Sequence, residues 1–337
     1  MARVFNEGSR FDRKRELKDR MLAWISYKLG VGPSLGNVYY VAVADSLYED
    51  NLLAMGIKSS EIVASLALGE DLLTTGQNDV LCVAGGSIIT ETASCTWDKS
   101  MTHMVGLGGP QKASPDIGTG FTNATATVAN VINNTGTGNQ FHDVTLTNAG
   151  AGASALTAFK NNGPGTFLSG CQIVGMMGAT ACDTTLASSL EIASSGYYFE
   201  ARDCVFGTSD YQTQGSDTNG VVLFSNTTVG ARPSDGIFKR CQFKTWIAAA
   251  SRCIIYMASE GLDRDWTFDD CIFYAFATNH AVAMNQVVGG TCSSTHDITF
   301  KHCAGINITA WKTDTDGCTW TVSPDATAKG GVTIAST

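Results

Sequence analysis

Four aspartates form the cluster most suited to chemistry in this 337-residue chain: Asp263, Asp265, Asp269 and Asp270. Clustered carboxylates supply the acid and the base of glycoside hydrolysis, and carboxylate oxygens are ligands that Ca²⁺ prefers. If the chain is an enzyme, we expect these four residues to be its catalytic or calcium-binding groups. Its substrate would then be a polysaccharide, cleaved by a hydrolase or a lyase reaction.

A structural role competes for the last two of these acids. Asp269-Asp270 occupies the same place in a sequence repeat as Lys239-Arg240 one repeat earlier and Lys301-His302 one repeat later. Neighbouring cations stabilise an ionised carboxylate and lower its pKa, whereas a general acid needs a raised pKa. The alternation of charge therefore favours a ladder of ion pairs that fixes the register of the repeats.

Cysteine and histidine give no sign of a metal site. No C-x-x-C pair occurs among the eleven cysteines, the five histidines form neither H-E-x-x-H nor H-x-H, and phosphate-binding and nucleophile-elbow motifs are absent. We therefore expect no cofactor and no bound metal, and we interpret the cysteines as small buried hydrophobic residues. A disulfide remains an alternative for four of them: Cys182, Cys253, Cys292 and Cys318.

The elements that position these residues come from a recurring motif of an apolar residue, two polar residues and a Cys. It appears as LSGCQI, ARDCVF, FKRCQF, FDDCIF and FKHCAG, preceded by FHDVTL with Val in place of Cys. The steps from Val144 through Cys171, Cys204, Cys241, Cys271 and Cys303 are 27, 33, 37, 30 and 32 residues. A period of this size predicts a solenoid, in which each repeat stacks only on its neighbours.

The spacing of apolar residues inside the motif shows which solenoid this is. Side chains alternate along a strand, so Trp266 and Phe268 share one face and Cys271 and Phe273 share one face, but Phe268 and Cys271 should oppose each other. All four are apolar and suit the core, which is possible if the polar pair between them turns a corner. A strand, a two-residue corner and a second strand in every repeat predict a coil of parallel β-structure.

With this coil motif, and with the segment QNDVLCVAGGSIITETASCTWDKSMTHMVGLGG before it, the sequence resembles the right-handed parallel β-helix. This is the fold of pectate-lyase-like proteins and of many phage tailspikes and virion proteins. The resemblance covers residues 75–325 and implies an all-β, single-stranded solenoid. Because the fold carries lyases, hydrolases, adhesins and structural proteins alike, the resemblance does not assign a function.

The amino-terminal segment differs in character from the rest of the chain. Residues 8–29 have the pattern of an amphipathic helix, with Ser9 as a candidate N-cap and apolar residues on one face. Residues 1–30 hold eight Lys or Arg against four acids, whereas the whole chain has a net charge of −9, so the remainder carries −13. We expect this basic arm to dock on a partner through eight residues: Arg10, Arg13, Lys14, Arg15, Lys18, Arg20, Trp24 and Lys28.

The predicted organisation has three parts. Residues 1–58 form the basic helical arm and attachment segment, with a short strand expected at 38–43. Residues 59–325 form the β-helix, beginning with a capping helix over SSEIVASLALGEDLL that starts at Ser59 or Ser60. Residues 326–337 form a carboxy-terminal tail.

Aromatic residues near the turns suggest a second kind of surface. Exposed aromatic rings bind the apolar faces of sugars, and the competing interpretation is that these residues only cover corners of the coil. The residues concerned are Tyr197, Tyr198, Tyr211, Trp246, Tyr274 and Trp311, whereas Trp266 and Trp320 have the pattern of core residues.

Together these features favour a structural component of a particle, and a small attachment element followed by a β-helix resembles the layout of phage virion proteins. The resemblance implies a non-enzymatic structural protein on the virion surface of a tailed bacteriophage, most simply a capsid decoration protein docked through its arm. We expect a homotrimer whose partners are phage capsid or tail proteins and, in addition, a host surface glycan. The acidic body argues against nucleic acid as a partner. The longest apolar runs are too short for membrane insertion. The charged start of the chain is unlike a signal peptide. The alternatives are a tailspike-type polysaccharide depolymerase and a glycan-binding adhesin.

Overall fold

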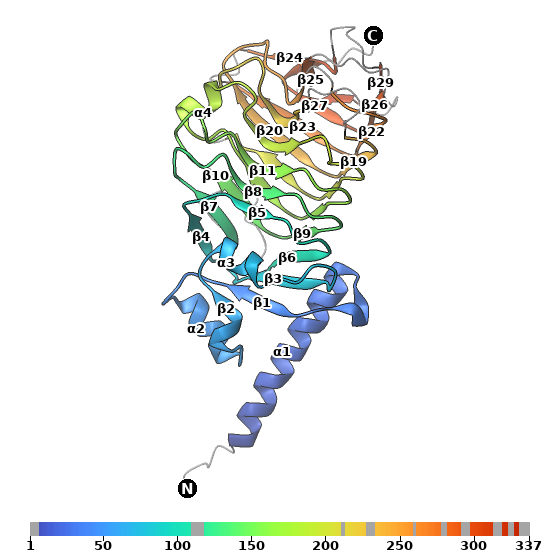
Figure 1. Ribbon diagram of the computed structural model, residues 1–337. Coiled ribbons are helices and arrows are strands. Elements are labelled where there is room, and N and C mark those ends of the chain that lie inside the picture. The colour runs from blue at the N-terminus through green and yellow to red at the C-terminus, as the bar shows by residue number, and fades with distance from the viewer. Residues whose placement is uncertain are drawn as a thin grey trace.

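The computed structural model describes residues 7–108, 118–209, 213–226, 233–258, 261–277, 282–290, 297–312, 319–322 and 327–329. Strands dominate these residues, and every strand pair within the sheets is parallel. Successive strands along the chain enter three different sheets in turn, so that each circuit stacks on the previous one and an elongated coil results (Figure 1). The chain is a right-handed parallel β-helix, as the sequence predicts.

Sheet A forms one side of the coil and contains the first strand of each circuit. In spatial order its strands are β2 (Ile62–Val63), β1 (Val38–Val41), β3 (Asp79–Val83), β6 (Thr102–Gly106), β9 (Gln140–His142), β12 (Phe167–Ser169), β15 (Glu200–Arg202), β19 (Gly236–Lys239), β22 (Trp266–Asp269), β26 (Asp297–Lys301) and β29 (Thr319–Val322).

Sheets B and C form the other two sides. Sheet B contains β4 (Ile88–Glu91), β7 (Gly120–Asn123), β10 (Thr145–Asn148), β13 (Gln172–Val174), β16 (Val205–Gly207), β20 (Gln242–Ile247), β23 (Ile272–Phe276), β27 (Ala304–Ile306) and β30 (Thr327–Lys329), with β17 (Thr213–Gln214) beside β20. Sheet C contains β5 (Cys95–Trp97), β8 (Asn130–Asn134), β11 (Thr157–Asn161), β14 (Ser188–Ile192), β18 (Gly220–Phe224), β21 (Ile255–Met257) and β25 (Val288–Gly290), and β24 (Met284–Gln286) pairs separately with β28 (Ile308–Ala310).

The polar pair of the repeat turns the corner from sheet A to sheet B, as predicted. The second residue of the pair adopts the left-handed conformation in four consecutive coils, with φ of 55° at Asp203, 52° at Arg240, 54° at Asp270 and 53° at His302. A single left-handed residue turns the chain sharply and thereby resets the alternation of side chains. The residues on both sides of the corner therefore face inward.

Aromatic rings from successive coils stack inside the solenoid. Phe238 and Phe268 lie 4.8 Å apart between ring centroids with 5° between their planes, and Phe300 continues the stack 5.3 Å beyond Phe268. Phe243 and Phe273 form a parallel second stack at 4.9 Å. These spacings match the separation of neighbouring strands, about 4.8 Å, so the strand register itself brings equivalent rings into contact.

The cysteines of the repeat form a buried ladder next to the corner. The Cys271 thiol donates to the carbonyl oxygen of Phe238 at 3.4 Å, and the Cys303 thiol donates to that of Phe268 at 3.2 Å, each one coil earlier. Burial raises the pKa of Cys271 and of Cys241, so these thiols stay protonated and unreactive at neutral pH. The interpretation as buried hydrophobic residues is confirmed for the nine cysteines that the structure describes, all of them buried free thiols. Cys182 and Cys253 are among them, contrary to the disulfide alternative, and Cys292 and Cys318 lie outside the described residues.

The amino-terminal end departs from the sequence prediction in one element. The expected helix from Ser59 is wrong, because Ser59–Glu61 forms a 3₁₀ turn (η2) and Ile62–Val63 pairs with β1 as strand β2. Both residues of β2 are β-branched, which suits a strand. The capping helix α3 (Leu66–Asp71) begins later, where Ser65 caps it by accepting the Leu68 amide at 3.3 Å.

Three further helices accompany the coil. Helix α1 (Glu7–Leu29) projects from the β1 end, α2 (Leu47–Ala54) lies beside that end, and α4 (Ala179–Asp183) sits on the side of the coil (Figure 1). Because α1 begins at Glu7, Ser9 lies within the helix and the N-cap prediction is wrong. A short 3₁₀ turn, η1 (Gly32–Ser34), links α1 to β1. None of the helices in the described residues is long and apolar enough to cross a membrane.

Candidate functional site

Helix α1 is docked on the coil along only part of its surface. Ile25 and Leu29 are buried against the outer side of β1, β3 and β6, in a cluster that also contains Tyr40 and Val80. In contrast, Leu17 is 51% exposed, Trp24 is 41% exposed and Tyr27 is 86% exposed. The inner stripe of α1 therefore anchors the helix to the body, and an apolar outer stripe remains open.

Polar contacts fix the carboxy-terminal half of α1 in place. The Lys28 ammonium forms an ion pair with Asp143 at the corner of the coil, and the Gln140 side-chain amide donates to the carbonyl oxygen of Leu29 at 3.3 Å. Lys18 pairs with Glu61 at 3.5 Å. These contacts join α1 to the β9 coil, through Gln140 and Asp143, and to the turn before β2, through Glu61, so the helix has a defined direction relative to the solenoid.

The predicted docking residues therefore divide into two groups. Lys18 and Lys28 are half-buried and hold α1 to its own body. The remaining described members are exposed on α1: Lys14, Arg15, Arg20 and Trp24. Of these, Arg20 makes one long contact within the helix, with Glu16 at 3.9 Å. Arg10 and Arg13 belong to the backbone of α1, and their side chains lie outside the described residues.

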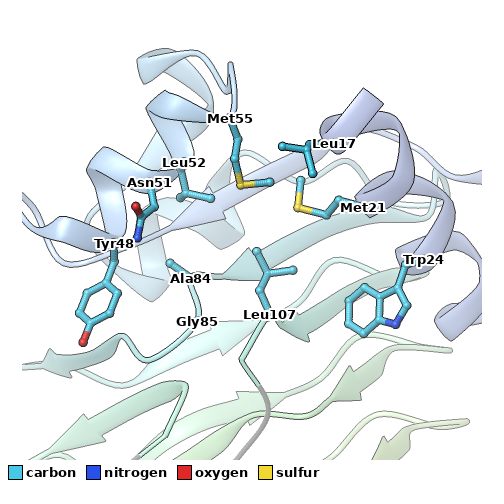
Figure 2. A pocket seen from close by; sticks show the side chains of 10 residues that line it. All are labelled: Leu17, Met21, Trp24, Tyr48, Asn51, Leu52, Met55, Ala84, Gly85 and Leu107. Atoms are coloured by element: carbon cyan, nitrogen blue, oxygen red, sulfur yellow. The ribbon is translucent and has the colours of Figure 1, made fainter. Parts of the chain in front are cut away.

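An apolar groove of about 510 Å³ runs between α1 and α2 (Figure 2). Leu17, Met21 and Trp24 line it from α1, and they face Leu52 and Met55 of α2 across the groove. Its remaining lining residues are Tyr48 and Asn51 of α2 and, from the ends of β3 and β6, Ala84, Gly85 and Leu107. We call these ten residues the basal groove.

Local sequence explains why α2 forms the far wall of the basal groove. The Ser46 hydroxyl accepts the Glu49 amide at 3.4 Å, and the Glu49 carboxylate accepts the Asp45 amide at 2.8 Å. This reciprocal arrangement closely resembles a capping box, S-x-x-E, which marks the start of a helix. Sequence reasoning missed α2 and its groove residues, although Ser46 and Glu49 carried the signal.

The acidic candidates divide between a charge ladder and a separate turn. The Asp269 carboxylate lies 3.7 Å from Lys239 and 3.0 Å from His302, on the coils before and after it. The hydrogen bond from His302, helped by Lys239, lowers the pKa of Asp269 below its ordinary value. Asp203 and Arg240 form the same kind of pair at 2.8 Å, so the predicted ion-pair ladder is confirmed for Asp269, whereas Asp270 is exposed.

The four aspartates do not form one compact site. Asp263 and Asp265 precede β22, whereas Asp269 and Asp270 lie at its end. Even the nearest pair across β22, Asp265 and Asp269, is four steps of extended chain apart, roughly 13 Å. Paired carboxylates in glycoside hydrolysis stand about 5 to 10 Å apart, and the low pKa of Asp269 does not suit a general acid.

The aromatic candidates differ widely in exposure. Tyr198 is 62% exposed, and Tyr197, Trp246 and Tyr274 are half-buried. Trp311 is fully buried and stacks on Phe300 at 4.6 Å, so its prediction as a surface residue is wrong. Trp266 lies in the core as predicted, and Tyr211 and the Trp320 side chain fall outside the described residues. Within the described ranges, no group of three or more His, Cys, Asp or Glu side chains is placed to hold a metal ion.

Comparison with known proteins finds similarity in structure but not in sequence. No protein-family model matches the sequence, and no curated protein is similar to it. Among solved structures, the chain is similar to the pectin methylesterase PemA from Erwinia chrysanthemi, with 13% identity and a TM-score of 0.41 over 86% of this chain and 80% of that one. It is also similar to the catalytic domain of a GH87 α-1,3-glucanase in complex with nigerose, with 9% identity and a TM-score of 0.25 over 88% and 68%. Identities this low leave the function to be inferred from the residues of the chain itself.

Proposed function

We propose that the chain is a non-enzymatic structural protein of a tailed-phage virion, a capsid decoration protein that is anchored through α1 and the basal groove. The observation that carries this proposal is the division of α1 into a stripe that holds the body and a stripe that the body leaves open. An attachment helix needs both, because it must be fixed relative to the solenoid and still offer contact area to a partner. The exposed stripe contains Trp, Tyr and Arg, the residue types that dominate binding energy at protein interfaces.

The charge of the exposed stripe determines the kind of partner. On a helix with 100° per residue, Arg20 lies beside Trp24 and Tyr27, while Lys14 lies one turn before Leu17. The apolar contacts of α1 are thus bordered by cations that the body does not neutralise. We therefore commit to one occupant: an acidic surface of a capsid or tail protein that inserts an apolar side chain or a helix face into the basal groove.

A co-sedimentation experiment with capsids assembled without this protein tests the proposal. The structure favours point variants over deletion of α1, because deletion would also remove the buried Ile25 and Leu29. We expect the double variant Leu17→Ser/Trp24→Ser to lose capsid association while circular dichroism stays β-rich. Leu186→Ser, a partly exposed leucine on the coil, is the matched control and should bind as the wild type does.

Charge reversal adds a second, independent readout. Arg20→Glu should weaken association with the capsid. Raising the salt concentration should weaken association of the wild type toward the level of that variant, because screening acts on exposed charges.

Capsid association that survives the double variant would refute the role of the basal groove. Self-association of the chain that the double variant abolishes would identify a second copy as the occupant. Release of reducing ends or unsaturated products from a host polysaccharide, lost in Asp270→Asn, would instead establish the depolymerase alternative.

A further inference from the structure

A second concave site lies on the outer face of sheet A and shares no lining residue with the basal groove. It is an open depression of about 310 Å³ over β9, β12 and β15. Gln140, Phe167 and Glu200 are in register on these three strands and stand side by side across its length. Their neighbours Phe141, Leu168 and Ala201 face the core, so the alternation of each strand places the first set outward.

The turns before these strands form the floor and one wall of the depression. Each turn contains one left-handed residue, with φ of 69° at Gly138, 69° at Gly165 and 53° at Tyr198. The three amides donate to carbonyl groups of the following coil at 2.8–2.9 Å, so the turns are stacked and fixed. In the first two turns the left-handed residue is a glycine, which has no side chain, and in the third it is Tyr198, whose ring is exposed. The depression is therefore bounded by an aromatic ring at one end and has no side chain at the equivalent positions of the other two turns.

Polar groups line the opposite side. Arg202 forms an ion pair with Glu200, and its guanidinium group lies 5.4 Å from the centre of the Phe167 ring. His142 packs edge-on against the same ring and approaches Gln140 through Nε2 at 3.0 Å. Burial, with a smaller effect of Lys28, lowers the pKa of His142 to about 3, so its ring is neutral. Glu200 and Arg202 therefore cancel, and the depression carries no net charge.

Buried amides support the rim from inside the coil. The Asn134 side chain donates to the Asn161 side-chain oxygen at 3.1 Å and to the Thr166 hydroxyl at 2.8 Å, and Asn139 donates to Asn134 at 2.8 Å. Thr166 immediately precedes Phe167, and Asn139 immediately precedes Gln140. The positions of the outward residues are thus set before any ligand arrives, which lowers the entropic cost of binding.

We propose that this depression is a binding site for a neutral pyranose sugar. Such a ring has one apolar face of C–H groups, which fits the exposed aromatic ring of Tyr198, and an edge of hydroxyl groups, which fits the Glu200 carboxylate as acceptor and the Arg202 guanidinium as donor. A concave site with aromatic walls and a few fixed polar groups is the usual form of a small-molecule site. Because the ion pair is internally neutral, a charged sugar gains no net attraction. The proposal is independent of the docking role of α1.

Saturation-transfer NMR tests the site with four probes: methyl α-D-glucopyranoside, methyl β-D-galactopyranoside, methyl N-acetyl-β-D-glucosaminide and, as the anionic comparison, methyl β-D-glucuronide. We expect wild-type protein to saturate the ring C–H protons of at least one neutral probe. Tyr198→Gly should reduce that signal at least fivefold without lowering the thermal unfolding midpoint, because glycine already occupies the equivalent left-handed position in two neighbouring coils. Tyr27→Ala removes an 86% exposed tyrosine of α1 and should leave the signal unchanged.

A variant that changes the charge of the depression should increase the binding of the anionic probe, where Tyr198→Gly decreases the binding of the neutral ones. Glu200→Gln leaves the Arg202 charge uncompensated, so the preference should shift from the neutral probes toward methyl β-D-glucuronide. The proposal is overturned if wild-type protein transfers saturation to none of the neutral probes, or if Tyr198→Gly transfers as much as the wild type. A signal that Tyr27→Ala abolishes would place saccharide binding on α1 and would equally overturn the site.

Discussion

Phe268 sits at the centre of the aromatic stack, and its replacement by alanine should divide the solenoid into two unfolding units. The ring is fully buried and stacks on Phe238 at 4.8 Å and on Phe300 at 5.3 Å. Replacement of a buried Phe by Ala costs about 3–5 kcal/mol, depending on how far the site collapses. The strands on both sides hold equivalent rings in strict register, so collapse is limited and we expect the upper part of this range.

The distribution of this loss is as informative as its size. In a solenoid each repeat contacts only its neighbours, so the variant weakens the two interfaces of the β22 coil, with the β19 coil and with the β26 coil, and leaves the others intact. The coils from β22 onward should then unfold at lower denaturant than the coils before β19. Total stability of a domain is about 5–15 kcal/mol, so a loss of about 4 kcal/mol at the β22 coil is enough to separate the two transitions.

Equilibrium urea unfolding, followed by both circular dichroism and tryptophan fluorescence, measures this effect. Trp266 and Trp311 report on the later coils and Trp97 on the early ones, so the two probes should no longer coincide in Phe268→Ala. Phe268→Leu keeps most of the volume and should cost less than about 1.5 kcal/mol. The outward-facing Phe167→Ala should change stability by less than about 1 kcal/mol. A single transition in Phe268→Ala, with a loss below about 1 kcal/mol, would refute the nearest-neighbour reasoning.

Two further variants test the corners of the coil. Asp269→Asn should lower the thermal unfolding midpoint at neutral pH by the equivalent of up to about 1 kcal/mol, because the folded pKa of Asp269 is depressed and its stabilisation is present above the unfolded pKa. The difference in unfolding midpoint between this variant and the wild type should disappear as pH falls through the pKa of Asp269 in the folded state. A difference in midpoint that persists in strong acid would contradict the charge ladder. Gly170→Ala should destabilise the chain more than Gly165→Ala, although both have similar positive φ, because a Cβ at Gly170 overlaps the Asp143 carboxylate that pairs with Lys28. Equal losses in chemical unfolding for the two alanine variants would show that the Asp143 contact adds nothing beyond backbone strain.

The coil could be predicted from sequence because its determinants are local. The parity conflict between Phe268 and Cys271 is visible within four residues, and it requires a corner wherever it recurs. The alternation of Asp269-Asp270 with cationic pairs is equally visible once the repeats are aligned, and the structure places Asp269 between Lys239 and His302 as expected.

The parts that escaped prediction depend on contacts between distant segments. Ile62 and Val63 follow a helix cap signal, but the edge of β1 was available to pair with them and the strand prevailed. The basal groove exists only because α1 and α2, which residues 30–46 separate in the sequence, meet over the ends of β3 and β6. Trp311 has the sequence context of a turn residue, yet it covers the end of the phenylalanine stack.

The repeat lengths of 27 to 37 residues have a consequence for the dimensions of the molecule. The extra residues lie in the turns, while the described strands of sheet A keep one strand per coil. From β1 to β15 there are five strand steps, through β3, β6, β9 and β12, and from β1 to β29 there are nine, which corresponds to heights of about 24 Å and about 43 Å. A body attached at α1 would thus carry the Tyr198 depression at a fixed height, and an insertion in a turn would widen the molecule without lengthening it. Only the gain or loss of a whole coil would change how far the surface extends from its attachment point.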